Sequence, residues 1–332
     1  MKRLLVITVV VLMAGVGVLG SLEKRASAAP IKLGAVSGLP SMADTFKPLP
    51  MLIDKVKSRS NGELIIEYKG GGEVVAPPDQ AVAVKKGIID MAMTFSAIYE
   101  GLVPGVKSMA LSQVYPWEER KNGAFALLQE AHAKAGLYYL GRGYFHPDPG
   151  GLFWIWSRPK IEKPGDFKGK RIGGISPAAN PFLQALGASP KVMDLSEAYT
   201  ALERGVIDCF WIAFTDIVPP GLAKVLPYCI DHPWYCDNNA IIINMNVWNR
   251  LSKPLQKVLT DSMIEVEHEA VKASEGVFDK HRKGMLDAGM KFVKFSPADA
   301  KSYVDMAYRT GWADVKGKYP DIGGKLEKLM SK

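Results

Sequence analysis

The chain has 332 residues, a formal net charge of +8 and three cysteines, and 48% of its residues are hydrophobic. This length exceeds the usual size of one hydrophobic core, so we expect two domains. The lysines are scattered and form no basic stripe, which argues against a nucleic-acid partner.

The N-terminal segment has the organisation of a secretory signal peptide. Lys2 and Arg3 precede an apolar run at 4–20, and a small-x-small cleavage site follows at 26–28. A membrane anchor is the alternative, but the run is slightly short for a spanning helix, which needs about 20 apolar residues. We therefore expect residues 1–28 to be removed and the mature chain to be a soluble periplasmic protein.

The mature chain opens with alternating strands and helices. Strands are expected at 31–36, 63–70 and 88–95, and helices at 46–60 and 77–87. The alternation is typical of a parallel sheet covered by helices. Such a sheet binds ligands outside the carboxyl ends of its strands.

The second half repeats this pattern. Strands are expected at 170–176, 189–195 and 206–214, and helices at 178–188 and 196–205. The pattern predicts a second α/β domain.

One phrase occurs in both halves. Residues 83–90 and 201–208 both read Ala-aliphatic-x-x-Gly-aliphatic-Ile-Asp. A glycine that ends a helix before an aliphatic strand is common in α/β proteins, and shared ancestry of the halves is the alternative reading. Either reading predicts two similar lobes.

The predicted lobes are linked by two apolar runs and one long helix. The runs at 150–159 and 238–246 have the composition of strands that cross from one sheet to the other. A helix at 252–289 would be unusually long for a globular protein, and a spine packed along both domains would explain it. We expect an α/β, two-lobed binding-protein fold with lobe I at 29–151 and 241–275, and lobe II at 152–240 and 276–332.

The cysteines leave two outcomes open. Export permits disulfides, and Cys229 and Cys236 are close enough in sequence to pair. Cys209 lies in an apolar strand, where we expect a buried free thiol.

Motifs of catalysis and cofactor binding are absent from the expected mature chain. Residues 29–332 contain no HExxH, CxxC, GxSxG, P-loop or GxGxxG pattern. The residues Glu265, Glu267, His268 and Glu269 spread around a helix, so a solvated face is favoured over a metal site. We expect neither an enzyme nor a bound cofactor or metal.

Aromatic residues gather in and near the crossing runs and the second repeated strand. They are Phe153, Trp154, Trp156, Phe210, Trp211, Phe214, Trp234 and Tyr235. Most are expected in the core, and at least two are candidates to line a cavity between the lobes, where small-molecule pockets commonly form.

Several segments together resemble a known family. "KSRSNGELIIEYKGGG", "VAVKKGIIDMAMTF", "IEKPGDFKGKRIGG", "LGASPKVMDLSEAYTALERGVIDC" and "VWNRLSKPLQKVL" fall in order across nearly the whole mature chain. They resemble the dicarboxylate-binding type of solute-binding subunits of tripartite ATP-independent periplasmic (TRAP) transporters. The resemblance implies a monomer that closes on one small molecule and hands it to membrane permease subunits.

The chain departs from that family's pattern where the family binds its ligand. The resemblance implies an Arg that takes the ligand carboxylate bidentately, but Gly173 stands at that place. Arg171, two residues earlier, or Arg142 would have to replace it. The family's polar residues after the repeated phrase correspond to Phe210, Trp211 and Ile212, and an aromatic contact before the next helix corresponds to Leu195.

These departures predict a large, apolar pocket for an organic acid or a bulkier, more aromatic solute. A carboxylate buried without a cation costs several kcal/mol, so it would need Arg171, Arg142, His146 or backbone amides. The candidate ligand-binding residues are Ser37, Ser96, Phe153, Arg171, Gly173, Ser176, Asn180, Leu195, Trp211, Ile212, Thr215 and Trp234. The alternatives are a ligand sensor that partners a signalling receptor and an exported enzyme on the same scaffold.

Overall fold

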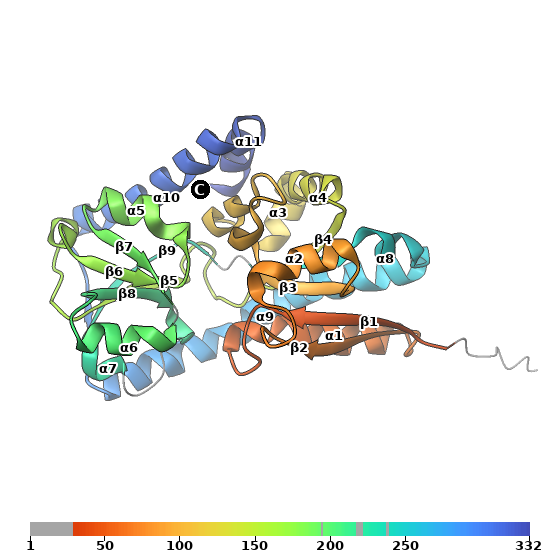
Figure 1. Ribbon diagram of the computed structural model, residues 1–332, viewed down its shortest axis with the longest axis horizontal. Helices are drawn as coiled ribbons and strands as arrows, with labels where there is room; N and C mark the ends of the chain where they lie inside the picture. Colours follow the sequence, from red (N-terminus) through yellow and green to blue (C-terminus); the bar gives the residue numbers. More distant parts are fainter. Residues whose placement is uncertain (1–28, 194, 217–221, 237–238) are drawn as a thin grey trace, which may run out of the picture.

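The computed structural model describes residues 29–193, 195–216, 222–236 and 239–332. The predicted signal peptide, residues 1–28, lies outside the described residues. The chain forms two lobes, each built on one β-sheet with helices against it (Figure 1). In the described part of the chain, no helix has the length and apolar character needed to cross a membrane. The predicted two-lobed α/β fold is confirmed.

The first lobe is built on a five-stranded sheet of order β2-β1-β3-β10-β4. Its strands are β1 (Ile31–Ser37), β2 (Leu64–Gly70), β3 (Met91–Phe95), β4 (Leu137–Arg142) and β10 (Asn239–Asn244). β1 is parallel to β2 and β3, whereas β10 runs antiparallel to β3 and β4.

The second lobe is built on a six-stranded sheet of order β11-β9-β5-β8-β6-β7. Its strands are β5 (Phe153–Ser157), β6 (Arg171–Gly174), β7 (Ser189–Val192), β8 (Cys209–Ala213), β9 (Tyr228–Trp234) and β11 (Lys291–Val293). β6 is parallel to β7 and β8, and β5 runs antiparallel to β8 and β9. Each sheet is thus mainly parallel and contains one antiparallel strand, β10 in the first sheet and β5 in the second.

Helices and short 3-10 turns cover the sheets. Before β5 they are η1 (Asp44–Phe46), α1 (Pro48–Arg59), α2 (Pro77–Lys86), η2 (Ser96–Tyr99), η3 (Val106–Leu111), α3 (Pro116–Asn122) and α4 (Ala124–Lys134). Between β5 and β9 they are η4 (Pro164–Phe167), η5 (Pro177–Ala179), α5 (Asn180–Ala185), α6 (Leu195–Glu203), η6 (Phe214–Asp216) and α7 (Leu222–Val225). The last helices are α8 (Met245–Arg250), α9 (Lys253–Asp287), α10 (Pro297–Lys318) and α11 (Pro320–Met330).

The repeated phrase has the same structure in both lobes. Gly87 and Gly205 both follow a helix with positive φ (72° and 64°), a conformation that glycine adopts without steric cost. The aspartate three residues later then fixes the neighbouring strand. Asp90 Oδ2 accepts the backbone N–H of Gly34 at 2.7 Å, and Asp208 Oδ2 accepts that of Arg171 at 2.9 Å. The phrase therefore encodes a helix end and the start of a buried strand.

The two apolar runs do not themselves extend across both sheets. Among the described residues, β5 pairs with β8 and β9 of the second sheet, and β10 pairs with β3 and β4 of the first. The chain changes lobes between β4 and β5 and again between β9 and β10. The runs are apolar because each becomes an inner strand with neighbours on both sides, which corrects the expectation of crossing strands.

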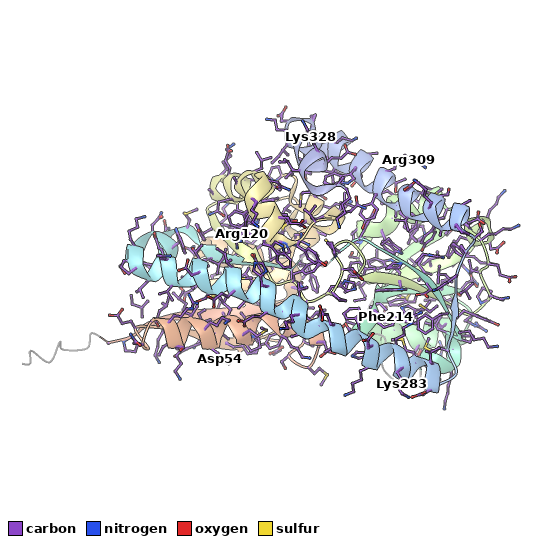
Figure 2. The ribbon with its side chains drawn as sticks, turned by 180° about the vertical axis from the view of Figure 1, so that it is seen from behind. Asp54, Arg120, Phe214, Lys283, Arg309 and Lys328 are labelled. Carbon is purple, nitrogen blue, oxygen red and sulfur yellow. The ribbon has the colours of Figure 1, made fainter. Side chains whose placement is uncertain are left out.

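The long helix α9 connects the lobes as the predicted spine. Its 35 residues extend roughly 50 Å at 1.5 Å per residue. Leu255, Leu259, Met263 and Val266 form a buried stripe at helical spacing. The helix packs against α1 and β4 in the first lobe and against η6 in the second. Figure 2 shows it crossing the back of the molecule to its end on the second lobe near Lys283.

The last two helices return across the top of the molecule (Figure 1). α10 packs against α5 and β9 of the second lobe, whereas α11 contacts α3 and α4 of the first. The backbone N–H of Gln113 donates to the carbonyl of Met330 at 2.7 Å. The chain boundaries expected for the lobes remain a prediction, and α11 lies against lobe I rather than lobe II.

All three cysteines are buried, and Cys229 and Cys236 form no disulfide. Cys229 lies in the extended strand β9 and Cys236 follows its end, so the strand holds the two apart by roughly 20 Å. The Cys236 thiol instead donates to the carbonyl of Met109 at 2.8 Å. Cys209 is a buried free thiol in β8, as predicted.

Candidate functional site

A cavity of about 750 Å³ lies between the two lobes, at the carboxyl ends of the parallel strands. The first lobe lines it after β1 and around β3, and the second lines it after β6 and along β8. Its lining residues are Gly38, Leu39, Pro40, Met42, Ala43, Asp44, Phe95, Ala97, Ile98, Ala110, Phe153, Ile175, Ser176, Ala178, Trp211, Ile212, Thr215, Asp216, Tyr235 and His281. This volume is within the range of sites that enclose a small organic molecule.

One wall of the cavity is aromatic. The rings of Phe153 and Trp211 meet edge to face, with centroids 5.2 Å apart and planes at 90°. Behind them, Trp234 lies 5.5 Å from the Trp211 ring. Gly174 makes this arrangement possible, because a Cβ at that position would overlap the Trp211 indole. The indole position is therefore set by a glycine on the adjacent strand.

The polar part of the cavity is acidic and joins three elements. Asp44 comes from η1, Asp216 from η6 and His281 from α9. Asp44 Oδ2 and His281 Nε2 share a hydrogen bond of 2.8 Å across the lobes. No Lys or Arg is among the described residues that line the cavity.

The two aspartates differ in their partners. Asp44 also pairs with Lys47, whose Nζ lies 2.6 Å from Oδ1. Burial opposes ionisation of Asp44, but the hydrogen bonds from Lys47 and His281 outweigh it and lower its pKa. Asp216 has only a long hydrogen bond of 3.4 Å from the Thr215 hydroxyl among the described contacts. Burial raises the pKa of Asp216 to about 6, and the charge of Asp44 adds to the rise.

Of the residues singled out from the sequence, some line the cavity. They are Phe153, Ser176, Trp211, Ile212 and Thr215. The Ser176 hydroxyl accepts the backbone N–H of Ala178 at 3.3 Å, so it also caps the turn that follows β6.

A second group lies next to the lining without belonging to it. Ser37 is buried, and its hydroxyl accepts the N–H of Leu39 at 3.0 Å. Ser96 is buried between the lining residues Phe95 and Ala97. Asn180 begins α5, and Trp234 packs behind Trp211.

The structure places Arg171 and Gly173 away from the cavity. Arg171 is at the amino end of β6, where it pairs with Asp208 at 2.7 Å with half of its side chain exposed. The cavity lies at the other end of the strand, roughly 10 Å further on. A Cβ on Gly173 would meet Ile207, Phe210 and Met193, so this glycine faces the packed core under α6 and adds no space to the cavity.

The other expected polar candidates also have structural partners. Arg142 is buried in the first lobe, where its guanidinium pairs with Glu119 and donates to the Cys236 sulfur. His146 shares a hydrogen bond of 2.7 Å with the carbonyl of Asp148, and burial lowers its pKa to about 4. Neither lines the cavity. The side chain of Leu195 lies outside the described residues.

The acidic end of the cavity is not among the candidate residues expected from the sequence. Asp216 directly follows the candidate Thr215, so its place after a strand end is the available signal. Asp44 follows the first strand by several residues and carried a weaker signal of the same kind. No sequence signal pointed to His281, because the side on which its side chain projects depends on how α9 is rotated about its axis. The described residues contain no group of three or more His, Cys, Asp or Glu placed to hold a metal ion.

Comparisons with known proteins agree with this architecture. The model of bacterial extracellular solute-binding protein family 7 (DctP) matches residues 39–310. A monocarboxylate 2-oxoacid-binding periplasmic protein of Nostoc sp. is 25% identical over 269 residues, 77% of this chain and 72% of that protein. A solute-binding protein of Albidiferax ferrireducens is 24% identical over 284 residues, 80% and 79% of the two chains.

A solved structure shares the fold. It is a TRAP periplasmic solute binding protein from Desulfovibrio salexigens with bound orotic acid. The TM-score is 0.78 at 20% identity, covering 90% of this chain and 97% of that chain. Because the family match covers most of the chain, this protein belongs to bacterial extracellular solute-binding protein family 7.

Proposed function

We propose that this chain is the periplasmic solute-binding subunit of a TRAP transporter. It captures one small molecule in the cavity between its lobes and delivers it to membrane permease subunits. The family match supports the solute-binding role. The TRAP assignment is supported by the quoted sequence segments and by the shared fold with the Desulfovibrio salexigens protein.

The placement of the cavity carries the proposal. Its lining comes from both lobes, from the connection at Tyr235 and from the spine helix at His281. A solute that contacts both lobes stabilises the arrangement in which they face each other, so binding is coupled to their relative position. A permease that recognises that arrangement would then accept only the loaded protein.

The lining also indicates the kind of solute. The aromatic wall of Phe153 and Trp211 favours a bulky apolar or aromatic body. The relatives named above bind a monocarboxylate 2-oxoacid and orotic acid. We infer a solute with a larger apolar part than a simple dicarboxylate, because a carboxylate in this cavity meets no Lys or Arg among the lining residues.

Native mass spectrometry of the purified protein, followed by a thermal-shift panel, tests the proposal. A ligand that binds only the folded state stabilises it by RT ln(1 + [L]/Kd), so a cognate solute raises Tm with concentration. Uptake of that solute by vesicles that carry the permease should require this protein. Chemical turnover of the bound molecule, or uptake that does not depend on the protein, would contradict the proposed function.

A further inference from the structure

The charge distribution in the cavity differs from what a carboxylate ligand requires. Its acidic and basic lining side chains, among the described residues, are Asp44, Asp216 and His281. The internal residues outside the description, 194, 217–221 and 237–238, include no Lys or Arg in the sequence. A carboxylate in the cavity would thus meet two acidic side chains, and no Lys or Arg is among the described residues that line the cavity.

Asp44 is already neutralised within the protein. Each of its carboxylate oxygens has a partner, Lys47 Nζ at 2.6 Å and His281 Nε2 at 2.8 Å. The Lys47 ammonium also lies 5.0 Å from the centroid of the Phe145 ring, which holds it on the first lobe. These contacts give each oxygen of Asp44 a partner and offset its charge, so Asp44 attracts a cationic ligand less than an unpaired carboxylate would.

The carboxylate oxygens of Asp216 can accept further hydrogen bonds. It lines the cavity, and the hydrogen bond from Thr215 is long at 3.4 Å. No ion pair joins it to a described residue. A carboxylate in such surroundings gains most from a donor that carries positive charge, because charge-assisted hydrogen bonds are roughly twice as strong as neutral ones.

The aromatic wall is suited to the same kind of ligand. Trp211 and Phe153 present rings on the second-lobe side of the cavity, together with Asp216. Aromatic rings attract organic cations through their quadrupole and also accept an apolar body. A carboxylate next to aromatic walls is therefore a cation-recognition site, whereas it repels an organic acid.

We propose that the cavity selects a solute with an ammonium head on an apolar body, with Asp216 accepting the ammonium N–H bonds and Trp211 and Phe153 packing against the body. This rests on the proposed function and specifies the polar group of its largely apolar solute as an amine rather than a carboxylic acid. Asp216 sets the sign of the charge that the protein accepts.

Matched amine and acid pairs test the proposal. Isothermal titration of the purified protein at pH 7.5 would compare 2-phenylethylamine with 3-phenylpropionate, and cyclohexylethylamine with 3-cyclohexylpropionate. Amines should bind at least tenfold more tightly than their matched acids. Asp216→Asn should remove at least tenfold of amine affinity, while Asp287→Asn, which lies on the exposed end of α9 beside Lys283, should leave it unchanged.

The pH dependence gives a second readout that does not depend on the variant's folding. Asp216 faces Asp44 from the first lobe, His281 from α9 and Thr215 on its own turn, and Asp44 is itself paired with Lys47. Its raised pKa of about 6 means that amine affinity should fall about tenfold between pH 7.5 and pH 5, as the carboxylate takes up a proton.

The outcomes separate this inference from the proposed function. If the acids bind more tightly than the amines, or if no amine binds, the amine proposal is overturned. The proposed function still stands if an acid or neutral solute binds and is taken up through the permease. It fails separately if no solute of any charge binds the cavity.

Discussion

The two lobes present different surfaces to one cavity, although the repeated phrase gives them the same framework. In the first lobe, Met93 of β3 is buried in the core, and the lining near it comes from Phe95, Ala97 and Ile98 instead. In the second lobe, Trp211 occupies the equivalent place in β8 and lines the cavity. The shared framework positions the strands, whereas the strand residues that differ decide which solute is accepted.

The aspartates sharpen this contrast. Asp44 on the first lobe is neutralised by Lys47 and His281, which lowers its pKa against the effect of burial. Asp216 on the second lobe has no such partners among the described residues, and burial raises its pKa to about 6. The same side chain is therefore a structural link in one lobe and an available acceptor in the other.

Gly174→Ala should break the aromatic wall and give the largest effect. The new Cβ would overlap the Trp211 indole, so the ring must leave its position. We expect the affinity for the solute to fall at least tenfold and the free energy of unfolding to fall by about 1–3 kcal/mol, as in other overpacked cores. Titration calorimetry and denaturant unfolding measure both. Gly165→Ala is the control, because no atom lies within 4 Å of its added Cβ, and equal behaviour of the two variants would refute the account of the wall.

Asp216→Asn should change how stability depends on pH. The pKa of Asp216 is about 6 in the folded protein against an ordinary value of 3.8, so the folded state binds the proton more tightly. The contribution of Asp216 to the free energy of unfolding should therefore fall as pH rises from about 4 to about 6, by on the order of 2–3 kcal/mol.

The variant should remove that loss, so it should be more stable than the native protein at pH 7.5 and similar to it at pH 4. Urea unfolding at both pH values measures the difference. Asp208→Asn is a control of opposite sign, because Arg171 lowers the pKa of Asp208. A difference in stability between the variant and the native protein that is the same at both pH values would contradict the assignment.

Asp44→Asn should have a smaller effect on binding. It removes the partner of Lys47 and His281, which we expect to cost about 1 kcal/mol of stability. It should also lower the pKa of Asp216, since the charge of Asp44 contributes to its rise. The pH midpoint of solute binding reports that change. Asp54→Asn, on the exposed face of α1, should leave the midpoint unmoved, and a tenfold loss of affinity in Asp44→Asn would show that Asp44 also binds the ligand.

Arg171→Ala should have the smallest effect. Its ion pair with Asp208 is largely exposed, and exposed pairs contribute about 0–1 kcal/mol. Because Arg171 lies at the end of β6 away from the cavity, solute affinity should stay within about twofold. Loss of binding in this variant would contradict the placement of the site.

The sequence predicts the fold because the fold depends on local signals. The spacing of apolar residues and glycines along the chain predicts where helices end and where buried strands follow. Examples are Gly87 before β3 and Gly205 before β8. The sequence could not show where the chain changes lobes, because an apolar run reads the same whether it crosses or becomes an inner strand. The sequence likewise could not show that Cys229 and Cys236 lie far apart, because their separation depends on how far the extended strand β9 continues.

The candidate site was only partly visible for a similar reason. Trp211 and Phe153 could be identified because aromatic residues are conspicuous within apolar strands of the sequence. The direction of a glycine could not be identified, and Gly174 rather than Gly173 faces the cavity-lining indole. His281 meets Asp44 only because a 35-residue helix carries it from one lobe to the other.

A crystal structure of the protein with the solute that native mass spectrometry identifies tests the central claim most directly. We predict that the solute lies between the lobes, with its apolar body against Trp211 and Phe153 and its polar head toward Asp216. A small dicarboxylate held by an arginine at the lobe interface, or a solute bound outside this cavity, would contradict the account.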